Sequence, residues 1–349
     1  MKFSFVILAL LLPFSVAAQQ DDNKDSLKIK NGKRSEFVRG YPDQFFVWPV
    51  LKQRKLDFEM KSADGDKTLR YKANKPYSLG VGMYLFELGF EIAFAVPLDE
   101  QSKRIYGDSH ARDVQLNIVG KKWGTDVFYQ RYIGFYIDDP DTDVAANTPY
   151  PQRPDIVTRN IGFTVNRIFN SDRFSFRSAY NFAERQLTSA GSLIVFASFD
   201  NIVMKGDSAI IGPTYEQQFA ASSSIHHIRS SNFGVAPGYT YSLIFKGFFM
   251  NGALALGPSN NWAKFSLDDG TEKSAFRFSL LVAARVSVGF NGDKFFGGLT
   301  FMNQGRNVGF EEIQLSNSQS AFKILIGYRF RETGLLKKRI WDLPKNFLN

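Results

Sequence analysis

The feature that most constrains the fold is a strict alternation along the chain. Between Phe276 and Phe290 every second residue is apolar, and the residues between them include Arg277 and Arg285. A period of two indicates a β-strand with one apolar face, because successive side chains of a strand point to opposite sides. That apolar face must meet either a second sheet or lipid.

The same alternation recurs along most of the chain. Further runs with apolar residues on one parity are 79–85, 88–96, 233–245, 248–256, 295–301 and 322–330. Runs of about ten residues have the length that a tilted strand needs to cross a bilayer. A two-layer sandwich would give the same alternation, but these faces consist mostly of Phe, Leu, Val and Tyr. The pattern predicts an all-β protein, a transmembrane antiparallel β-barrel.

The connections predict the number of strands. Outer-membrane barrels have short turns on the periplasmic side and long loops outside. The expected short turns are 86–87, 120–122, 170–172, 246–247 and 291–293. The expected long loops are 97–111, 138–154, 201–230, 258–273 and 304–318. If residues 67–85 and 173–199 are each one strand, the barrel has about twelve strands and both chain ends lie in the periplasm. A turn within residues 184–191 would instead bring the count to about fourteen.

The remaining segments flank the barrel. Residues 1–18 contain a lysine, an apolar run and small residues, which is typical of a cleaved secretory signal peptide. An uncleaved membrane helix is the alternative, but the apolar run is short for one. We expect a polar leader over residues 19–53, the barrel over 54–330 and a basic C-terminal tail over 331–349. The tail is either a solvated extension or an amphipathic turn at the membrane surface.

Composition and charge bear on partners and cofactors. The chain has no cysteine, which excludes disulfides, thiol nucleophiles and thiolate metal sites. The net charge of +9 comes from scattered basic residues, so it gives no indication of nucleic-acid binding. Tyr328 and Phe330 give the last strand an aromatic end of the kind that the barrel-insertion machinery reads. The expected partners are this machinery, the lipid bilayer and lipopolysaccharide; no cofactor is expected.

Charged residues on the polar parity are the candidates for function. An arginine that faces lipid at the bilayer midplane costs roughly 2–4 kcal/mol, so these residues are expected to face the lumen. The candidates are Glu91, Arg177, Arg277, Arg285 and Lys323. Asp126 and Glu184 are further acidic partners for the cations. The set forms either an anion-selective constriction or a salt-bridge network that plugs a narrow barrel, and we favour the network.

One strand does not follow the scheme. In residues 125–137, Arg131 and Gln130 lie on opposite parities, so each face carries one polar residue among aromatic rings. A β-bulge near Gln130 would resolve the conflict. Alternatively, the inner face of this strand is aromatic and contacts a ligand or a plug.

The sequence gives little support for catalysis. The three histidines, His110, His226 and His227, all fall in predicted external loops. Serines near His226 and His227 could supply a Ser–His pair, but no Asp or Glu is nearby to orient either ring. Adjacent residues of an extended chain point in opposite directions, which disfavours a shared metal site. The acidic segments 138–143 and 266–272 match no complete calcium loop. We therefore predict no catalytic, cofactor-binding or metal-binding residue.

Four segments resemble a Bacteroidetes family with a domain of unknown function, numbered 4421. They are SLGVGMYLFELGFEIAF (78–94), DVFYQRYIGFY (126–136), residues 153–192, and GVAPGYTYSLIFKGFFMNGAL (234–254). The resemblance spans most of the chain and implies an exported, barrel-like envelope protein. It implies no catalytic or ligand-binding residue.

Three functional hypotheses follow from the sequence. The favoured one is an outer-membrane barrel that serves either as a narrow channel or as a structural part of the envelope. The second is an outer-membrane hydrolase that acts on lipid or protein. The third is a soluble β-sandwich of the periplasm or cell surface that binds a ligand.

Overall fold

The computed structural model describes residues 34–42, 44–62, 65–74, 77–85, 88–219, 223–310 and 313–331. The predicted signal peptide, the first part of the predicted leader and all but the first residue of the predicted tail lie outside the described residues. None of the helices within the described residues has the length and apolarity to span a membrane.

Long antiparallel strands make up most of the described chain. The main sheet has thirteen strands: β2 (Gln44–Lys61), β3 (Thr68–Lys72), β4 (Ser78–Leu85), β5 (Leu88–Ala95), β6 (His110–Val119), β7 (Trp123–Asp138), β8 (Gln152–Ile168), β10 (Ala190–Lys205), β11 (Ile225–Phe245), β12 (Phe248–Leu267), β13 (Glu272–Asn291), β14 (Phe295–Phe310) and β15 (Ile313–Arg331). A separate pair consists of β1 (Val38–Gly40) and β9 (Glu184–Gln186). The short helices are α2 (Arg34–Phe37), α3 (Glu100–Tyr106), α4 (Arg177–Tyr180), the 3₁₀ helix η1 (Pro213–Tyr215) and α5 (Glu216–Phe219).

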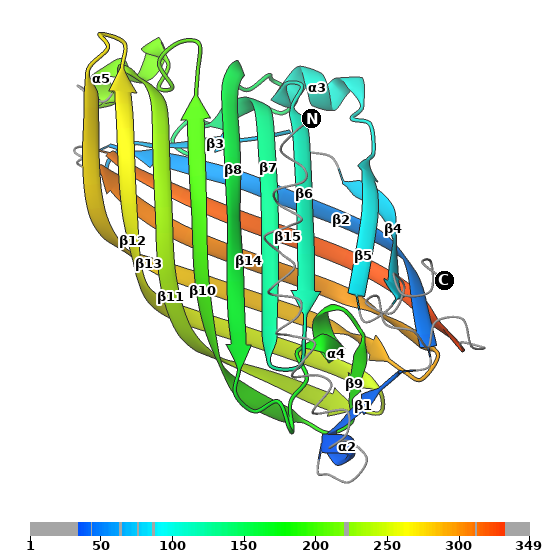
Figure 1. The fold of residues 1–349 in the computed structure, drawn as a ribbon. Coiled ribbons are helices and arrows are strands. Elements are labelled where there is room, and N and C mark those ends of the chain that lie inside the picture. The colour runs from blue at the N-terminus through cyan, green and yellow to red at the C-terminus, as the bar shows by residue number, and fades with distance from the viewer. Residues whose placement is uncertain are drawn as a thin grey trace, which may run out of the picture.

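The main sheet curls and closes on itself. β15 pairs with β2 along nearly its whole length, and β3 joins β2 to β7. In Figure 1 the strongly tilted β14, β15 and β2 form the back of the barrel behind the more upright β8, β10 and β11. The antiparallel barrel predicted from the alternation is therefore confirmed against the alternative of a two-sheet sandwich.

We name the two ends of the barrel by their connections. The long-loop end carries the connections 96–109, 139–151 and 206–224. The short-turn end carries the turns 120–122 and 246–247.

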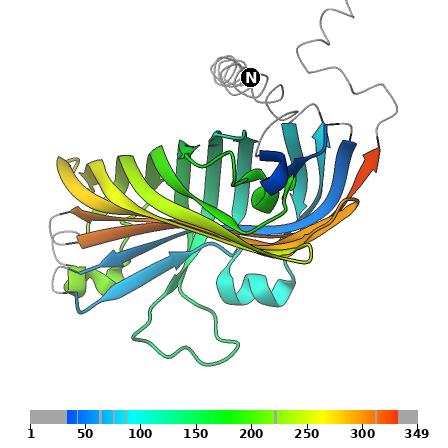
Figure 2. The same ribbon diagram turned by 90° about the horizontal axis from the view of Figure 1, so that it is seen from below.

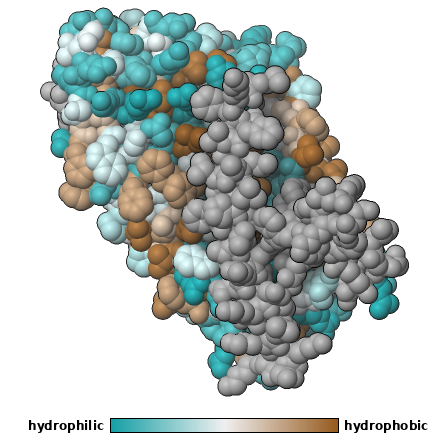
Figure 3. All heavy atoms as spheres, viewed as in Figure 1, coloured by the Kyte–Doolittle hydropathy of each residue, from teal (hydrophilic) through white to brown (hydrophobic). Residues whose placement is uncertain are grey.

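The outer and inner faces of the sheet differ as the alternation requires. On β13 the outward Phe278 is 79% exposed, whereas the inward Leu281 is 1% exposed. Exposed apolar side chains occur on the outward face of strands all around the sheet. In Figure 3 they form a hydrophobic band over the front strands, below a hydrophilic long-loop end. A continuous exposed apolar belt on a closed sheet is the surface that lipid requires.

The strands are longer than predicted. β12 extends to Leu267 and β13 begins at Glu272, so most of the expected loop 258–273 is strand. β14 ends at Phe310 and β15 begins at Ile313, which likewise replaces most of the expected loop 304–318. These segments are polar because the strands continue beyond the apolar band, where their side chains no longer face lipid. Their backbones stay paired in the sheet.

The predicted strand 67–85 is divided into two. β3 and β4 both pair antiparallel with β2, and the chain between them leaves the sheet at Asn74. The Asn74 amide donates to the carbonyl oxygens of Ser102 and Gly107 in the α3 region, at 3.2 and 2.8 Å. These bonds hold the chain away from the ladder at this point. β3 and β4 together correspond to one of the twelve predicted strands.

The prediction of a single strand over residues 173–199 is wrong. The chain instead enters the barrel over residues 169–189, which we call the plug, and β10 begins only at Ala190. Figure 2 shows the sheet curling around α4, which belongs to the plug. Phe174, Phe176 and Phe182 of the plug are almost fully buried against the inner wall. Each such ring that is fully buried stabilises the plug by about 1.5–3 kcal/mol.

The N-terminal boundary of the barrel also lies earlier than expected. β2 begins at Gln44, inside the segment 19–53 that we expected to be a polar leader. Just before it, β1 pairs with β9 of the plug, with Arg39 opposite Arg185. The chain that leads into the barrel wall is therefore attached to the plug.

The ambiguous strand is β7. Gln130 and Tyr132 face inward and are buried, so Arg131 faces outward. The bulge occurs at Gly134, further along the strand than predicted, where φ is +83°. The inner face of the strand is aromatic and packs inside the barrel.

Candidate functional site in the barrel interior

The barrel interior consists of three layers. The plug fills the short-turn end, and its aromatic side chains pack against inward residues such as Phe46 and Phe296. Ion pairs occupy the middle, which we call the charged layer. A second apolar cluster, which we call the cap, fills the long-loop end and includes Phe58, Tyr71 and Phe219.

A buried carboxylate organises the plug. One oxygen of Glu184 lies 2.8 Å from Arg34 Nη2 and also accepts the Ser175 hydroxyl, and the other lies 3.7 Å from Arg177 Nη1. Burial alone would raise the pKa of Glu184, but Arg34, Arg177 and the Ser175 hydroxyl outweigh it and hold the pKa at about 2. Because Arg34 belongs to α2, this cluster joins the N-terminal segment to the plug.

Arg329 connects the plug to the barrel wall. From β15 its guanidinium donates to the carbonyl oxygens of Phe182 and Gly292, and to the side-chain oxygen of Asn291 at 2.7 Å. The same group lies 4.1 Å from the ring centroid of Tyr41. Phe182 has a φ of +57°, which bulky residues rarely adopt. Arg329 therefore holds the plug at its most strained residue.

Glu91 forms the first ion pair of the charged layer. Lys323 Nζ lies 3.0 Å from Glu91 Oε1, and Lys52 Nζ lies 3.8 Å from Glu91 Oε2. The indole of Trp48 donates to the same carboxylate at 3.2 Å. Two cations and one hydrogen bond thus satisfy one inward carboxylate.

Two more ion pairs complete the charged layer. Arg54 of β2 pairs with Asp113 of β6, and Gln130 donates to the same carboxylate at 3.3 Å. Arg285 of β13 pairs with Asp126 of β7 at 2.8 Å. These pairs link strands across the lumen.

The sequence-predicted residues occupy different parts of this interior. Glu91, Lys323 and Arg285 lie in the charged layer, whereas Arg177 lies in the plug and not on a wall strand. Arg277 has the inward parity of β13, but its side chain is exposed, and among the described residues its one hydrogen bond goes to the carbonyl oxygen of Phe276.

Sequence reasoning missed four interior residues: Arg34, Lys52, Arg54 and Asp113. Lys52 and Arg54 share the inward parity of Trp48 on β2. That parity would have revealed them had the barrel been expected to begin before residue 54. No sequence pattern indicates Arg34, because its ion pair is with Glu184 of the plug, which the sequence did not predict.

The cap is closed by the connection between β10 and β11. Ile210 and Ile211 of this connection are almost fully buried among the inward side chains of the wall. The Tyr71 hydroxyl and Arg153 Nη1 both donate to the carbonyl oxygen of Ile210, at 2.9 and 2.6 Å. The connection therefore folds inward over the lumen.

The histidines do not share a site. His226 and His227 are consecutive on β11, at a β-bulge between Ile225 and His227. His226 Nδ1 lies 3.3 Å from Asp268 Oδ1, so the expectation that no carboxylate lies near this histidine is wrong. Asp268 comes from the connection between β12 and β13, and no spacing in the sequence reveals that approach. Within the described residues no three acidic or histidine side chains are grouped so as to hold a metal ion.

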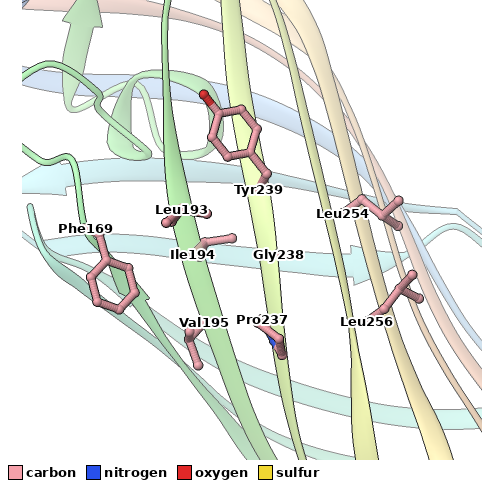
Figure 4. Close-up of a pocket in the computed structure, with 9 residues that line it drawn as sticks. All are labelled: Phe169, Leu193, Ile194, Val195, Pro237, Gly238, Tyr239, Leu254 and Leu256. Atoms are coloured by element: carbon pink, nitrogen blue, oxygen red, sulfur yellow. The ribbon is translucent and has the colours of Figure 1, made fainter.

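The outer surface carries a shallow groove of about 540 Å³. Figure 4 shows its lining, which comes from β10, β11 and β12, with Leu193, Tyr239 and Leu254 among the residues, and from Phe169 at one side. The lining is almost wholly apolar, and it belongs to the lipid-facing band. The groove is therefore no entrance to the charged layer.

One part of the wall lacks backbone pairing. Among the described strands β5 pairs only with β4, and β6 pairs only with β7. Figure 1 shows β5 and β6 as neighbours joined through α3. We call this part of the wall the seam, and the charged layer lies just behind it, with Glu91 on β5 and Asp113 on β6.

A closed antiparallel sheet with an apolar outer belt and ion pairs in its lumen is typical of outer-membrane β-barrels. The profile of the family described as Domain of unknown function (DUF4421) matches residues 24–330. The chain therefore belongs to this family, as the resemblance predicted.

Comparison with solved structures gives outer-membrane proteins. The translocator domain of the autotransporter NalP from Neisseria meningitidis is 11% identical, with a TM-score of 0.33, and the match covers 90% of this chain and 98% of that one. The attachment invasion locus protein Ail of Yersinia pestis is 10% identical, with a TM-score of 0.24, and the match covers 82% and 99%. These likenesses are too distant to carry an argument about function. A search of the curated proteins found no match.

Proposed function

We propose that this chain is a closed outer-membrane barrel with a structural role in the envelope and that it is not an open diffusion channel. The observation that carries this proposal is that apolar side chains fill both ends of the lumen, at the plug and at the cap. An ion that crossed the barrel would have to displace buried aromatic rings and separate Glu184 from its arginines. Breaking a buried ion pair costs about 3–5 kcal/mol.

The orientation is part of the proposal. We place the long-loop end outside the cell and the short-turn end in the periplasm, as in bacterial outer-membrane barrels. Both ends of the barrel domain then lie in the periplasm, after export through the signal peptide of residues 1–18. In this orientation the barrel-insertion machinery meets Tyr328 and Phe330, and lipopolysaccharide surrounds the upper part of the apolar band.

Conductance in planar bilayers tests the closed state. We expect the purified, folded chain to give no steps of single-channel current. A variant in which Gly-Ser linkers replace both residues 172–188 of the plug and residues 207–218 of the connection between β10 and β11 should conduct, because the plug is then absent and the connection no longer closes the cap. A control variant with a linker of the same kind in the exposed connection 140–148 should stay silent. Steady conductance from the unmodified chain would overturn the proposal.

A gated conduit is the second candidate function. The observation that favours it is the charged layer, which lies between two apolar closures and next to the seam. In a gated conduit, Glu184→Gln should loosen the plug and produce intermittent current steps. If this variant stays silent while the linker variant conducts, the structural role is supported.

A further inference from the structure

Three arginines lie side by side on neighbouring strands of the barrel wall. Arg112 of β6 is the direct cross-strand partner of Arg131 of β7, and Arg131 is in turn the partner of Arg159 of β8. Directly opposed residues on adjacent strands are about 5 Å apart. We call these three residues the arginine row.

The arginine row faces away from the lumen. On each strand the neighbouring residue faces inward: Asp113 takes part in the ion pair with Arg54, and Gln130 and Asn160 are buried. Because side chains alternate along a strand, the row lies on the outer surface of the barrel. Arg112 and Arg159 are exposed there, and Arg131 is partly exposed.

The three charges have no acidic partner in the described part of the chain. No hydrogen bond or ion pair joins any of the three to another described residue. The cations of the charged layer differ, because Arg54, Arg285 and Lys323 each contact a carboxylate. Like charges that face each other across strands are destabilising. An anion bound between the three guanidinium groups would relieve this repulsion, and the described chain does not supply one.

The row marks one border of the apolar band. The next outward residues toward the short-turn end are Val114, Tyr129 and Ile161, which are cross-strand partners of one another. On the side of the long-loop end, the next outward residues are His110, Ile133 and Val157, which are cross-strand partners, and Val157 lies opposite Lys205. A cation costs only about 0–1 kcal/mol near a bilayer interface, against about 2–4 kcal/mol at the midplane. The position suits the depth of lipid head groups.

The geometry points to a binding site for the phosphorylated head group of an outer-leaflet glycolipid on Arg112, Arg131 and Arg159. This inference rests on the proposed function for its orientation, because the long-loop end must face the outer leaflet. Each guanidinium can give two parallel hydrogen bonds to a phosphate, and three of them span about 10 Å, enough for a head group with two phosphates. The acyl chains then lie on the apolar residues below the row.

Lipid binding to the purified chain in neutral detergent tests the site. We expect lipid A with two phosphates to bind, as measured by native mass spectrometry. Changing all three arginines to glutamine (R112Q, R131Q and R159Q) should weaken binding at least about tenfold, since each loses charge-assisted hydrogen bonds. A matched control removes three cations at the short-turn end (R167Q, K246Q and K294Q) and should bind normally.

Further arms separate the sources of phosphate. Inorganic phosphate at millimolar concentration should not displace the lipid, and phosphatidylglycerol should bind more weakly than lipid A. Equal binding of phosphatidylglycerol, displacement by free phosphate, or undiminished binding by the triple variant would overturn the inference. If the triple variant does not fold, the single variants R131Q and R131K replace it. R131K should bind lipid A more tightly than R131Q but less tightly than the unmodified chain. Equal binding by R131Q, R131K and the unmodified chain would contradict the site. Because binding in detergent does not depend on conductance, a failure here is distinct from a failure of the closed-barrel proposal.

Discussion

At the scale of single residues, buried charges hold the plug in place. Arg329 satisfies two backbone carbonyl oxygens that have no access to water. We predict that Arg329→Gln lowers the free energy of unfolding by about 2–4 kcal/mol, because it leaves the buried carbonyl oxygen of Phe182 without its guanidinium donor. Urea unfolding of the chain in lipid vesicles measures the loss. Arg331→Gln is the control, because Arg331 is exposed, and an equal effect of both changes would contradict this role.

Glu184 gives the plug a dependence on pH. Its pKa is about 2 in the folded chain, against an ordinary value of 4.5. The folded pKa is depressed, so the stabilisation is fully present above pH 4.5 and is lost as the pH falls toward 2. Glu184→Gln should remove the loss of stability between pH 4.5 and pH 2, and it should lower the free energy of unfolding at neutral pH. Glu36→Gln, on the exposed surface of α2, should leave both quantities unchanged. The measurement is the unfolding midpoint at pH values between 2 and 7. If Glu184→Gln leaves the dependence of this midpoint on pH unchanged, the role of Glu184 is contradicted.

At the scale of elements, the bulge of β7 fixes the connection that precedes β6. Gly134 has a φ of +83°, and a Cβ added there would lie 2.6 Å from the carbonyl oxygen of Asp108. We predict that Gly134→Val costs about 1–3 kcal/mol and exposes the chain at residues 96–109 to proteases. Gly270→Val tests specificity, because Gly270 has the same sign of φ but open space around it. Equal protease sensitivity of the two variants would argue against a positioning role for the bulge.

The sequence predicts those elements whose environment is uniform along their length. The runs that end at Phe290 and Leu256 appear as strands with the expected outward faces, because apolar side chains at every second residue contact lipid along the whole run. The plug could not be predicted, because its residues meet aromatic rings and ions inside the barrel and follow no period. The length of β12 and β13 was underestimated because polar side chains at the long-loop end resemble a loop. Lys52 and Arg54 were missed because the strand that carries them was expected to be a leader.

At the scale of the whole molecule, the apolar band decides where the chain resides. We predict that Leu280→Arg lowers stability in vesicles by about 2–4 kcal/mol, because a cation is then placed within the apolar band. Ser274→Arg, on the same face of β13 but beyond the band, should cost no more than about 1 kcal/mol. Both changes place arginine on one strand and one face, so only depth differs.

The contact between the outward face and lipid is the central claim, and the absence of cysteine makes it directly measurable. A single cysteine that carries a spin label is placed at Leu280 on the outer face, at Ser287 on the inner face, or at Ser274 beyond the band. In vesicles the label at Leu280 should collide often with oxygen and seldom with a water-soluble nickel chelate. The label at Ser274 should meet the chelate freely, and the label at Ser287 should meet neither. Ready access of the chelate to the label at Leu280 would contradict the account.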